Sequence, residues 1–276
     1  MEQNLMAPLW LKYPSIPEGS IGWRMGYGES YAEQFYQWFY KLTPEEQNDY
    51  KYKFPEPVCW SLSEHNIKRR GDFWLYNWEA AKSNMESVES LKKDQRIGIK
   101  RKTVFFWGHH QQKDGYVGKE CFSQWYRADF YVGHLKYCCM EQYMMSKKAL
   151  LFGDTETNEE IMNATSQGKI KSLGRSVKNF NEGVWKEWKQ LIVLTGNYYK
   201  FSQLKDARRV LLETGDAILA EASPNDTIWG IGMAAKEAQH SAPAQWRGSN
   251  LLGFALMTVR AEIARLRKYE NEILNS

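Results

Sequence analysis

The chain has 276 residues, of which 43% are hydrophobic and 25% are charged, a composition typical of a globular protein with one large core. The net charge of +4 permits an anionic partner without requiring one. No apolar run is long enough to span a bilayer and the N-terminus lacks a signal-peptide pattern, so we expect no membrane partner. The four cysteines lack zinc-binding spacing, which predicts reduced thiols in the cytoplasm, with no metal and no cofactor.

Residues 1–102 are irregular and rich in aromatic side chains. The segment "SYAEQFYQWFYKL" has apolar residues at helical spacing, and "TPEEQ" predicts a second helix with Thr43 as its N-cap and Pro44 at its first position. The basic tract 92–102 predicts a solvated strand or loop edge, with phosphate contact as the alternative. We interpret 1–102 as an N-terminal extension that packs on the main domain, residues 103–276.

The main domain alternates short strand patterns with long helical ones. "TVFFWG" predicts a buried strand from Thr103, and the following segment predicts a hairpin with its turn near Gly133. Helices are predicted over 139–152, 157–166, 168–178, 181–197, 202–213 and 214–221, and from about Asn250 onward. "GIGMAA" (230–235) is interpreted as a turn, because no good strand precedes it. The predicted fold class is mainly α with a few short β-strands.

One predicted helix, "MEQYMMSKKALL", places an acid and an amine on its apolar side. Glu141 and Lys148 are seven residues apart, which is about 10.5 Å along the axis and nearly in line. Desolvation there would lower the pKa of the amine, making it a usable nucleophile, and raise that of the carboxyl, making it a usable acid. The alternative is an amphipathic helix whose Glu and Lys reach solvent at its edges. Lys147, on the adjacent face, is better placed for solvent.

Four segments together resemble the NADAR family. They are "CFSQWYRADFYVGHLKYCCMEQYMMSKKALLFGD", "KIKSLGRSVKNFNEGVWKEWK", "LAEASPNDTIWGIG" and "RGSNLLGFALMTVRAEI", which cover roughly Thr103 to Arg265 and keep the family order. The residues that fall on family positions are Glu141, Lys148, Lys171, Gly174, Arg175, Trp185, Trp229, Gly230, Gly232, Asn250, Gly253 and Arg260.

The resemblance implies cleavage of an N-glycosidic bond at a ribose anomeric carbon, in a NADAR-type fold. One branch of the family splits phosphoribosyl-aminopyrimidine intermediates of riboflavin synthesis. Another removes ADP-ribose from guanine bases in nucleic acid and opposes DarT-type toxins. In that branch the family lysine is thought to form a Schiff base, which implies Lys148 as nucleophile and Glu141 as proton donor and acceptor.

Some positions depart from the family pattern. Ile231 stands where the riboflavin-type branch tends to have aspartate, Gln142 where many members have histidine, and Gln124 where the motif FSN has asparagine. The first departure disfavours the riboflavin-type reaction, and "GSIGWRMGYGE" is similar to an extension of the guanine-specific members. We therefore expect a glycohydrolase acting on guanine-linked ADP-ribose, with the riboflavin-type N-glycosidase and a non-catalytic NAD or ADP-ribose binding module as alternatives.

Further residues are assigned to substrate binding. Lys171 and Arg175, one helical turn apart, are expected to meet a phosphate or to form a solvated basic face. Trp185 and Trp229 would stack a base or fill the core. The remaining candidates are the FSQWY-motif residues Phe122, Ser123 and Tyr126, the turn glycines Gly230 and Gly232, and Asn250, which would cap a helix or also bond a ribose.

The expected partners are ADP-ribosylated DNA or an ADP-ribose-like small molecule, with a DarT-type toxin as functional counterpart. The basic tract 92–102 would help to hold a polynucleotide. The sequence does not decide whether the substrate is DNA or RNA, or whether the protein acts as an antitoxin or in phage counter-defence. It also leaves the oligomeric state open.

Overall fold

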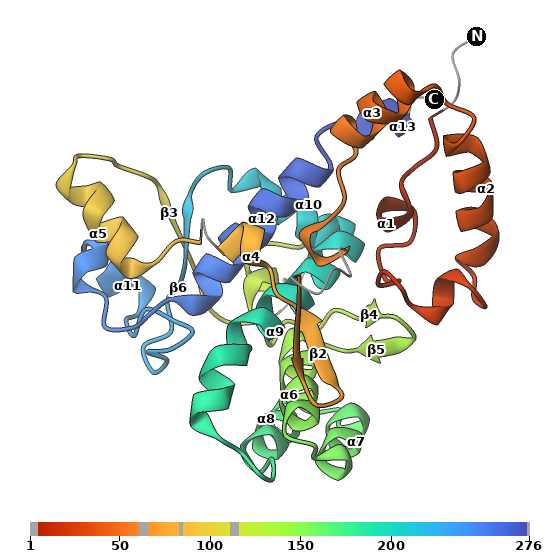
Figure 1. Ribbon diagram of the computed structural model, residues 1–276. Coiled ribbons are helices and arrows are strands. Elements are labelled where there is room, and N and C mark those ends of the chain that lie inside the picture. Colours follow the sequence, from red (N-terminus) through yellow and green to blue (C-terminus); the bar gives the residue numbers. More distant parts are fainter. Residues whose placement is uncertain (1–4, 61–65, 83–84, 111–115, 275–276) are drawn as a thin grey trace.

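The computed structural model describes residues 5–60, 66–82, 85–110 and 116–274, and Figure 1 shows a mainly helical architecture with a few short strands. The helices are α1 (Leu9–Lys12), α2 (Glu29–Phe39), α3 (Pro44–Lys53), α4 (Glu79–Lys82), α5 (Val88–Arg96), α6 (Met140–Leu151), α7 (Thr155–Asn163), α8 (Gln167–Arg175), α9 (Glu182–Gln203), α10 (Lys205–Glu213), α11 (Ala235–Ala238), α12 (Leu251–Leu266) and α13 (Glu270–Leu274). The strands are β1 (Ile67–Arg70), β2 (Phe73–Tyr76), β3 (Thr103–Phe106), β4 (Phe130–Val132), β5 (Leu135–Tyr137) and β6 (Ile218–Glu221). Within the described ranges, no helix is both long and apolar enough to cross a membrane.

The two predicted N-terminal helices are present as α2 and α3. Thr43 caps α3 as expected: its hydroxyl accepts from the backbone N of Glu46, whose carboxylate accepts from the backbone N of Thr43. The last helix, α13, lies beside α3 (Figure 1), and Lys53 forms an ion pair with Glu272 at 3.1 Å. The C-terminal helix is therefore joined to the N-terminal part of the chain through α3.

Residues upstream of 103 contribute to the same hydrophobic core as the rest of the chain. Trp78 is fully buried, and its indole Nε1 donates to Thr195 Oγ1 of α9 at 3.0 Å. The backbone N of Val58 donates to Glu262 Oε1 of α12 at 2.8 Å. Because burying apolar surface is the main favourable term in folding, this part of the chain stabilises the helices that carry the site.

Three pairs of strands occur in the described chain. The predicted hairpin is present as β4 and β5, with Gly133 in the turn at φ +63°. The predicted strand from Thr103 is β3, which pairs in parallel with β6, Thr103 opposite Ile218. The prediction of a helix over 214–221 is wrong, because β6 occupies 218–221. A left-handed Gly215, at φ +57°, follows α10, and the apolar "ILA" that follows is buried against β3 and α12.

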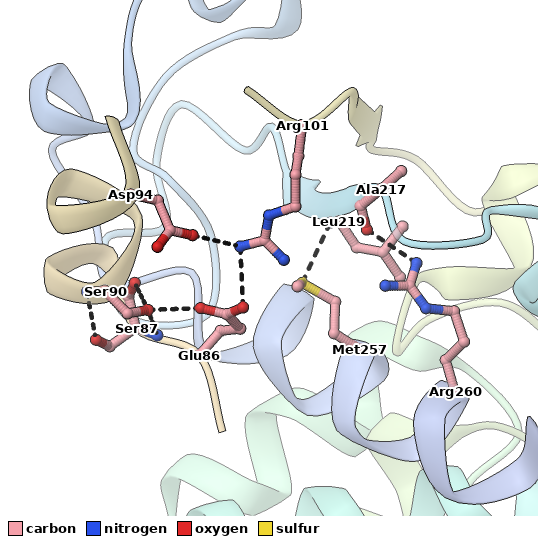
Figure 2. A network of polar contacts seen from close by, with 9 residues as sticks. All are labelled: Glu86, Ser87, Ser90, Asp94, Arg101, Ala217, Leu219, Met257 and Arg260. Atoms are coloured by element: carbon pink, nitrogen blue, oxygen red, sulfur yellow. Dashed lines mark hydrogen bonds and ion pairs between the residues drawn. The ribbon is translucent and has the colours of Figure 1, made fainter. Parts of the chain in front are cut away.

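The basic tract 92–102 does not form the expected strand or loop edge over its first half, because residues 88–96 form α5. Ser87 caps this helix by accepting from the backbone N of Ser90. Arg101 is held by ion pairs to Glu86 at 2.9 Å and Asp94 at 3.2 Å (Figure 2). The guanidinium of Arg101 is therefore paired with carboxylates of the protein itself, which leaves it unsuited to bind a phosphate.

Helix α12 approaches β6 closely at Gly253. A Cβ added there would collide with the carbonyl oxygen of Leu219, and neither backbone can move without disturbing the strand pair. We expect Gly253→Ala to lower the free energy of unfolding by about 3 kcal/mol, measured by urea denaturation. The matched control is Ala261→Gly at an exposed position of the same helix, expected to cost only about 1 kcal/mol. A Gly253→Ala protein as stable as wild type would contradict the close approach.

Candidate active site

Helix α6 turns Glu141 and Lys148 toward one cavity of about 210 Å³. The walls come from α6, α8, the start of α9, the segment before the β4–β5 hairpin, and the loop after β6. The lining residues are Gln124, Trp125, Glu141, Met144, Met145, Lys148, Lys171, Gly174, Arg175, Trp185, Glu221, Asp226 and Trp229. The alternative of a helix whose acid and amine reach solvent at its edges does not fit this arrangement.

Lys148 is the amine of the cavity. Its Nζ donates to the carbonyl oxygen of Gly174 at 2.7 Å and lies 4.2 Å from the centroid of the Phe180 ring. Burial lowers the pKa of Lys148, while the carboxylates of Glu182 and Glu141 oppose that shift. Because only the neutral amine is nucleophilic, this environment favours attack on an electrophile.

Glu141 is the acid of the cavity and is only 5% exposed. Burial raises its pKa to about 7, against the opposing charge of Lys171. Its backbone N donates to the carbonyl oxygen of Gln124 at 2.8 Å, which fixes the first turn of α6 against the neighbouring wall. Near neutral pH this carboxyl can both give and take a proton.

Two more carboxyl groups line the cavity, Glu221 and Asp226, and neither was predicted from the sequence. Burial raises the pKa of Glu221 to about 8, and the charges of Asp226 and Glu141 add to the shift. Asp226 Oδ1 accepts from the backbone N of Trp229 at 2.7 Å, which holds the loop after β6. Glu221 could have been found, because it directly follows the short apolar run 218–220 and so lies at the end of a strand. The prediction of a helix over 214–221 obscured this pattern.

Four of the predicted binding residues lie at the cavity: Lys171, Arg175, Trp185 and Trp229. Lys171 and Arg175 are exposed on one face of α8, and the Nζ of Lys171 is 5.0 Å from the centroid of the Trp125 ring. Both tryptophans are half-buried rather than enclosed in the core. The cavity thus has two cations at its opening and aromatic faces on its walls, a combination suited to phosphates and to flat rings.

The FSQWY-motif candidates are not among the residues that line the cavity. Phe122 is fully buried against Phe106, with ring centroids 5.5 Å apart. Tyr126 is buried, and the Nζ of Lys200 lies 5.6 Å from its ring centroid. The hydroxyl of Ser123 accepts from the backbone N of Trp125 at 3.2 Å. These three residues therefore lie behind the side chains that line the cavity.

The turn residues Gly230, Gly232 and Asn250 also lie behind the cavity. The interpretation of "GIGMAA" as a turn is confirmed, with Gly232 at φ +67°. Asn250 occupies the N-cap position of α12, as predicted, but its side chain forms no capping hydrogen bond. Its Oδ1 accepts from the backbone N of Glu221 at 3.1 Å and its Nδ2 donates to the carbonyl oxygen of Leu219 at 2.8 Å. Asn250 is fully buried, so it positions Glu221 instead of bonding a ribose.

Lys147 is not better placed for solvent than Lys148, since both are half-buried. Its Nζ is 5.4 Å from the centroid of the Tyr143 ring, beside a separate cavity of about 420 Å³ on the other side of α6. Burial lowers the pKa of Lys147 to about 8. Helix α6 therefore carries two amines with lowered pKa, and only Lys148 lines the cavity that contains Glu141.

This burial predicts a pH-dependent effect of Lys147→Met. Since the folded-state pKa lies below the unfolded one, the penalty of the buried charge is complete below about pH 8 and disappears above about pH 10.5. We expect Lys147→Met to raise the free energy of unfolding by about 1–3 kcal/mol at pH 7 and by much less at pH 10.5. Chemical denaturation at both pH values measures this, and a gain that persists at pH 10.5 would assign the effect to packing.

Comparison with known proteins identifies the family. The model of the NADAR domain matches residues 105–264. The N-glycosidase R617 of Acanthamoeba polyphaga mimivirus is 46% identical over 166 residues, which are 58% of this chain and 96% of the viral protein. The N-glycosidase YbiA of Escherichia coli is 30% identical over 124 residues, 45% of this chain and 69% of that protein.

The solution NMR structure of Escherichia coli YbiA aligns with a TM-score of 0.50 and 24% identity, covering 62% of this chain and 89% of the other. It supports the fold, mainly α with few short strands. The chain therefore belongs to the NADAR family. The names of these relatives indicate a glycosidase function in the family.

Proposed function

We propose that this protein is an N-glycosidase that removes ADP-ribose from guanine bases of nucleic acid. The observation that carries the proposal is the shared cavity of Lys148 and Glu141, in which burial lowers the pKa of the amine and raises that of the carboxyl. Simple binding of a nucleotide does not require a desolvated amine beside a buried acid, whereas covalent catalysis with proton transfer does.

In the proposed reaction, the neutral Nζ of Lys148 attacks the anomeric carbon C1′ and the bond from C1′ to the guanine nitrogen breaks. Glu141 gives its proton to the departing base. The new C–N bond then gains double-bond character as the C1′–O4′ bond breaks, O4′ takes a proton, and the amine loses one, which leaves a Schiff base. Ionised Glu141 activates water, whose addition returns free ADP-ribose and the lysine.

The rest of the substrate is assigned by charge and size. A furanose ring fits the cavity of about 210 Å³, which is smaller than the pockets of about 300–1,000 Å³ that enclose drug-sized ligands. The pyrophosphate would therefore lie at the opening, where Lys171 and Arg175 are exposed. In a cell this activity would reverse the modification made by a DarT-type toxin, as an antitoxin or as a phage counter-defence.

The riboflavin-type reaction is the alternative that differs in substrate. Ile231, at the position where that branch tends to have aspartate, is fully buried and does not line the cavity. Its backbone N donates to the carbonyl oxygen of Glu221 at 2.9 Å. Position 231 therefore has no contact with the cavity through which it could select between the two substrates.

The deciding experiment incubates the protein with a single-stranded DNA carrying one guanine-linked ADP-ribose, with the matching RNA, and with a phosphoribosyl-aminopyrimidine. Chromatography follows free ADP-ribose, and mass spectrometry follows the return of the unmodified oligonucleotide. We expect release from an oligonucleotide and none from the pyrimidine. Cleavage of the pyrimidine alone would identify the riboflavin-type reaction. Binding of ADP-ribose without any cleavage would identify a binding module.

A further inference from the structure

The side chain of Gln124 has an unusual environment. It is 5% exposed and lines the cavity, yet neither its Oε1 nor its Nε2 has a hydrogen-bond partner in the described part of the chain. A buried amide without partners is costly, so nearly all such groups in folded proteins are satisfied. An exception at a cavity wall is a place where a ligand can supply the missing partners.

The backbone around Gln124 is fixed in place. Its carbonyl oxygen accepts from the backbone N of Glu141 at 2.8 Å. The buried amine of Lys200 donates to the carbonyl oxygens of Cys121 at 2.6 Å and Ser123 at 3.3 Å. These bonds connect Gln124 itself to α6 and the residues just before it to α9, so its unsatisfied amide belongs to an ordered wall.

The chemistry of the amide narrows the class of ligand. A carboxamide presents one acceptor and two donors side by side, which matches the N–H and C=O of a lactam in two parallel hydrogen bonds. Sugar hydroxyls have other partners in this cavity, since Glu141, Glu221 and Asp226 are all acceptors. Phosphates have the two exposed cations of α8. The group left without a partner is the base.

The proposed substrate contains two bases, the departing guanine and the adenine of ADP-ribose. The position of Gln124 indicates which of them its side chain contacts. The carbonyl oxygen of Gln124 accepts from the backbone N of Glu141, and the side chains of both residues line the cavity in which the Glu141 carboxyl protonates the departing base in the proposed reaction. The adenine of ADP-ribose lies on the far side of the pyrophosphate. The base attached to C1′ is therefore the nearer one.

We propose that Gln124 is the specificity residue for the leaving base and binds the lactam edge of guanine, N1–H and O6, through its side-chain amide. This inference rests on the proposed function and names the group that recognises its substrate. Gln124 stands where the family motif has asparagine. The glutamine side chain is one methylene longer, so its amide lies further from the backbone than that of an asparagine would.

The test compares two substrates and two proteins. The substrates carry ADP-ribose on guanine or on O6-methylguanine, which has neither N1–H nor a free O6. The proteins are wild type and Gln124→Met, which keeps length and removes the hydrogen bonds. We expect wild type to lose about 10- to 100-fold in kcat/KM on O6-methylguanine, and Gln124→Met to lose as much on guanine. Combining the two changes should add little, since both remove the same pair of bonds.

Thermal melting of the free protein separates specificity from structure. Because the amide is unpaired without ligand, Gln124→Met should melt at or above the wild-type temperature. Losses that multiply when the two changes are combined, or equal wild-type rates on both substrates, would overturn the role of Gln124 while leaving the glycohydrolase intact. If no substrate is cleaved, the proposed function fails. Titration with guanosine and 1-methylguanosine then still tests recognition, which requires at least tenfold weaker binding of the methylated base.

Discussion

Replacing Lys148 by alanine is expected to lower kcat by at least about 1,000-fold, because the substitution removes the proposed nucleophile. Lys148→Arg should be equally inactive, since it keeps a positive charge at this site but stays protonated at every working pH. Release of ADP-ribose from the modified oligonucleotide measures both. Borohydride added during turnover should trap the substrate on wild type and on neither variant.

Lys147 provides the matched control for this experiment. It is the next residue of α6 and also has a pKa lowered by burial, but it lines a different cavity. Lys147→Met should therefore keep wild-type turnover and still be trapped by borohydride, with the adduct located on Lys148 by peptide mass spectrometry. An adduct on Lys147, or full turnover by Lys148→Ala, would refute the assignment of the nucleophile.

Replacing Glu141 by glutamine is expected to lower kcat by about 100- to 10,000-fold, the usual contribution of one acid–base group. The substitution keeps the size and one hydrogen-bond acceptor of the side chain and removes its proton exchange. Single-turnover measurements on the modified oligonucleotide report this step directly. Glu187→Gln, at an exposed position of α9, is the control and should leave turnover unchanged.

The pH profile gives a sharper test of Glu141. The reactive state of the pair holds one proton, shared between the carboxyl, with its pKa raised to about 7, and the amine, with its pKa lowered by burial. We expect wild-type activity to rise up to about pH 7, stay level, and fall above the pKa of Lys148. In Glu141→Gln the rise should continue past pH 7 until Lys148 is neutral, with no fall beyond. An unchanged profile would exclude this carboxyl from the rate.

The arrangement of the acidic side chains explains why the pKa values of the glutamates in this cavity are raised. Glu141, Glu221 and Asp226 crowd one desolvated space, and like charges resist ionising together. Lys171 opposes the shift of both glutamates. The cations and carboxyls come from helix α8, helix α6, the last residue of β6 and the loop that follows it, so the balance depends on packing between segments far apart in sequence.

The sequence by itself determined the helical framework and the central pair. Apolar spacing, caps and glycine turns are local signals, so α2, α3, α6 and the β4–β5 hairpin could be predicted, with Thr43 and Gly133 in their expected places. The seven-residue separation of Glu141 and Lys148 is likewise a local property of one helix.

Tertiary structure alone decided the rest. The segment 218–221 became a strand because β3 pairs with it, a contact over more than 100 residues that no local pattern records. The same pairing placed Glu221 in the cavity, and the amide of Asn250 bonds to the backbone of β6. The amide of Gln124 lies buried at the cavity wall without a partner in the described chain. Burial and hydrogen bonding arise from neighbours distant in sequence, so they set the pKa values and the unsatisfied groups that distinguish a reactive site from a helix face.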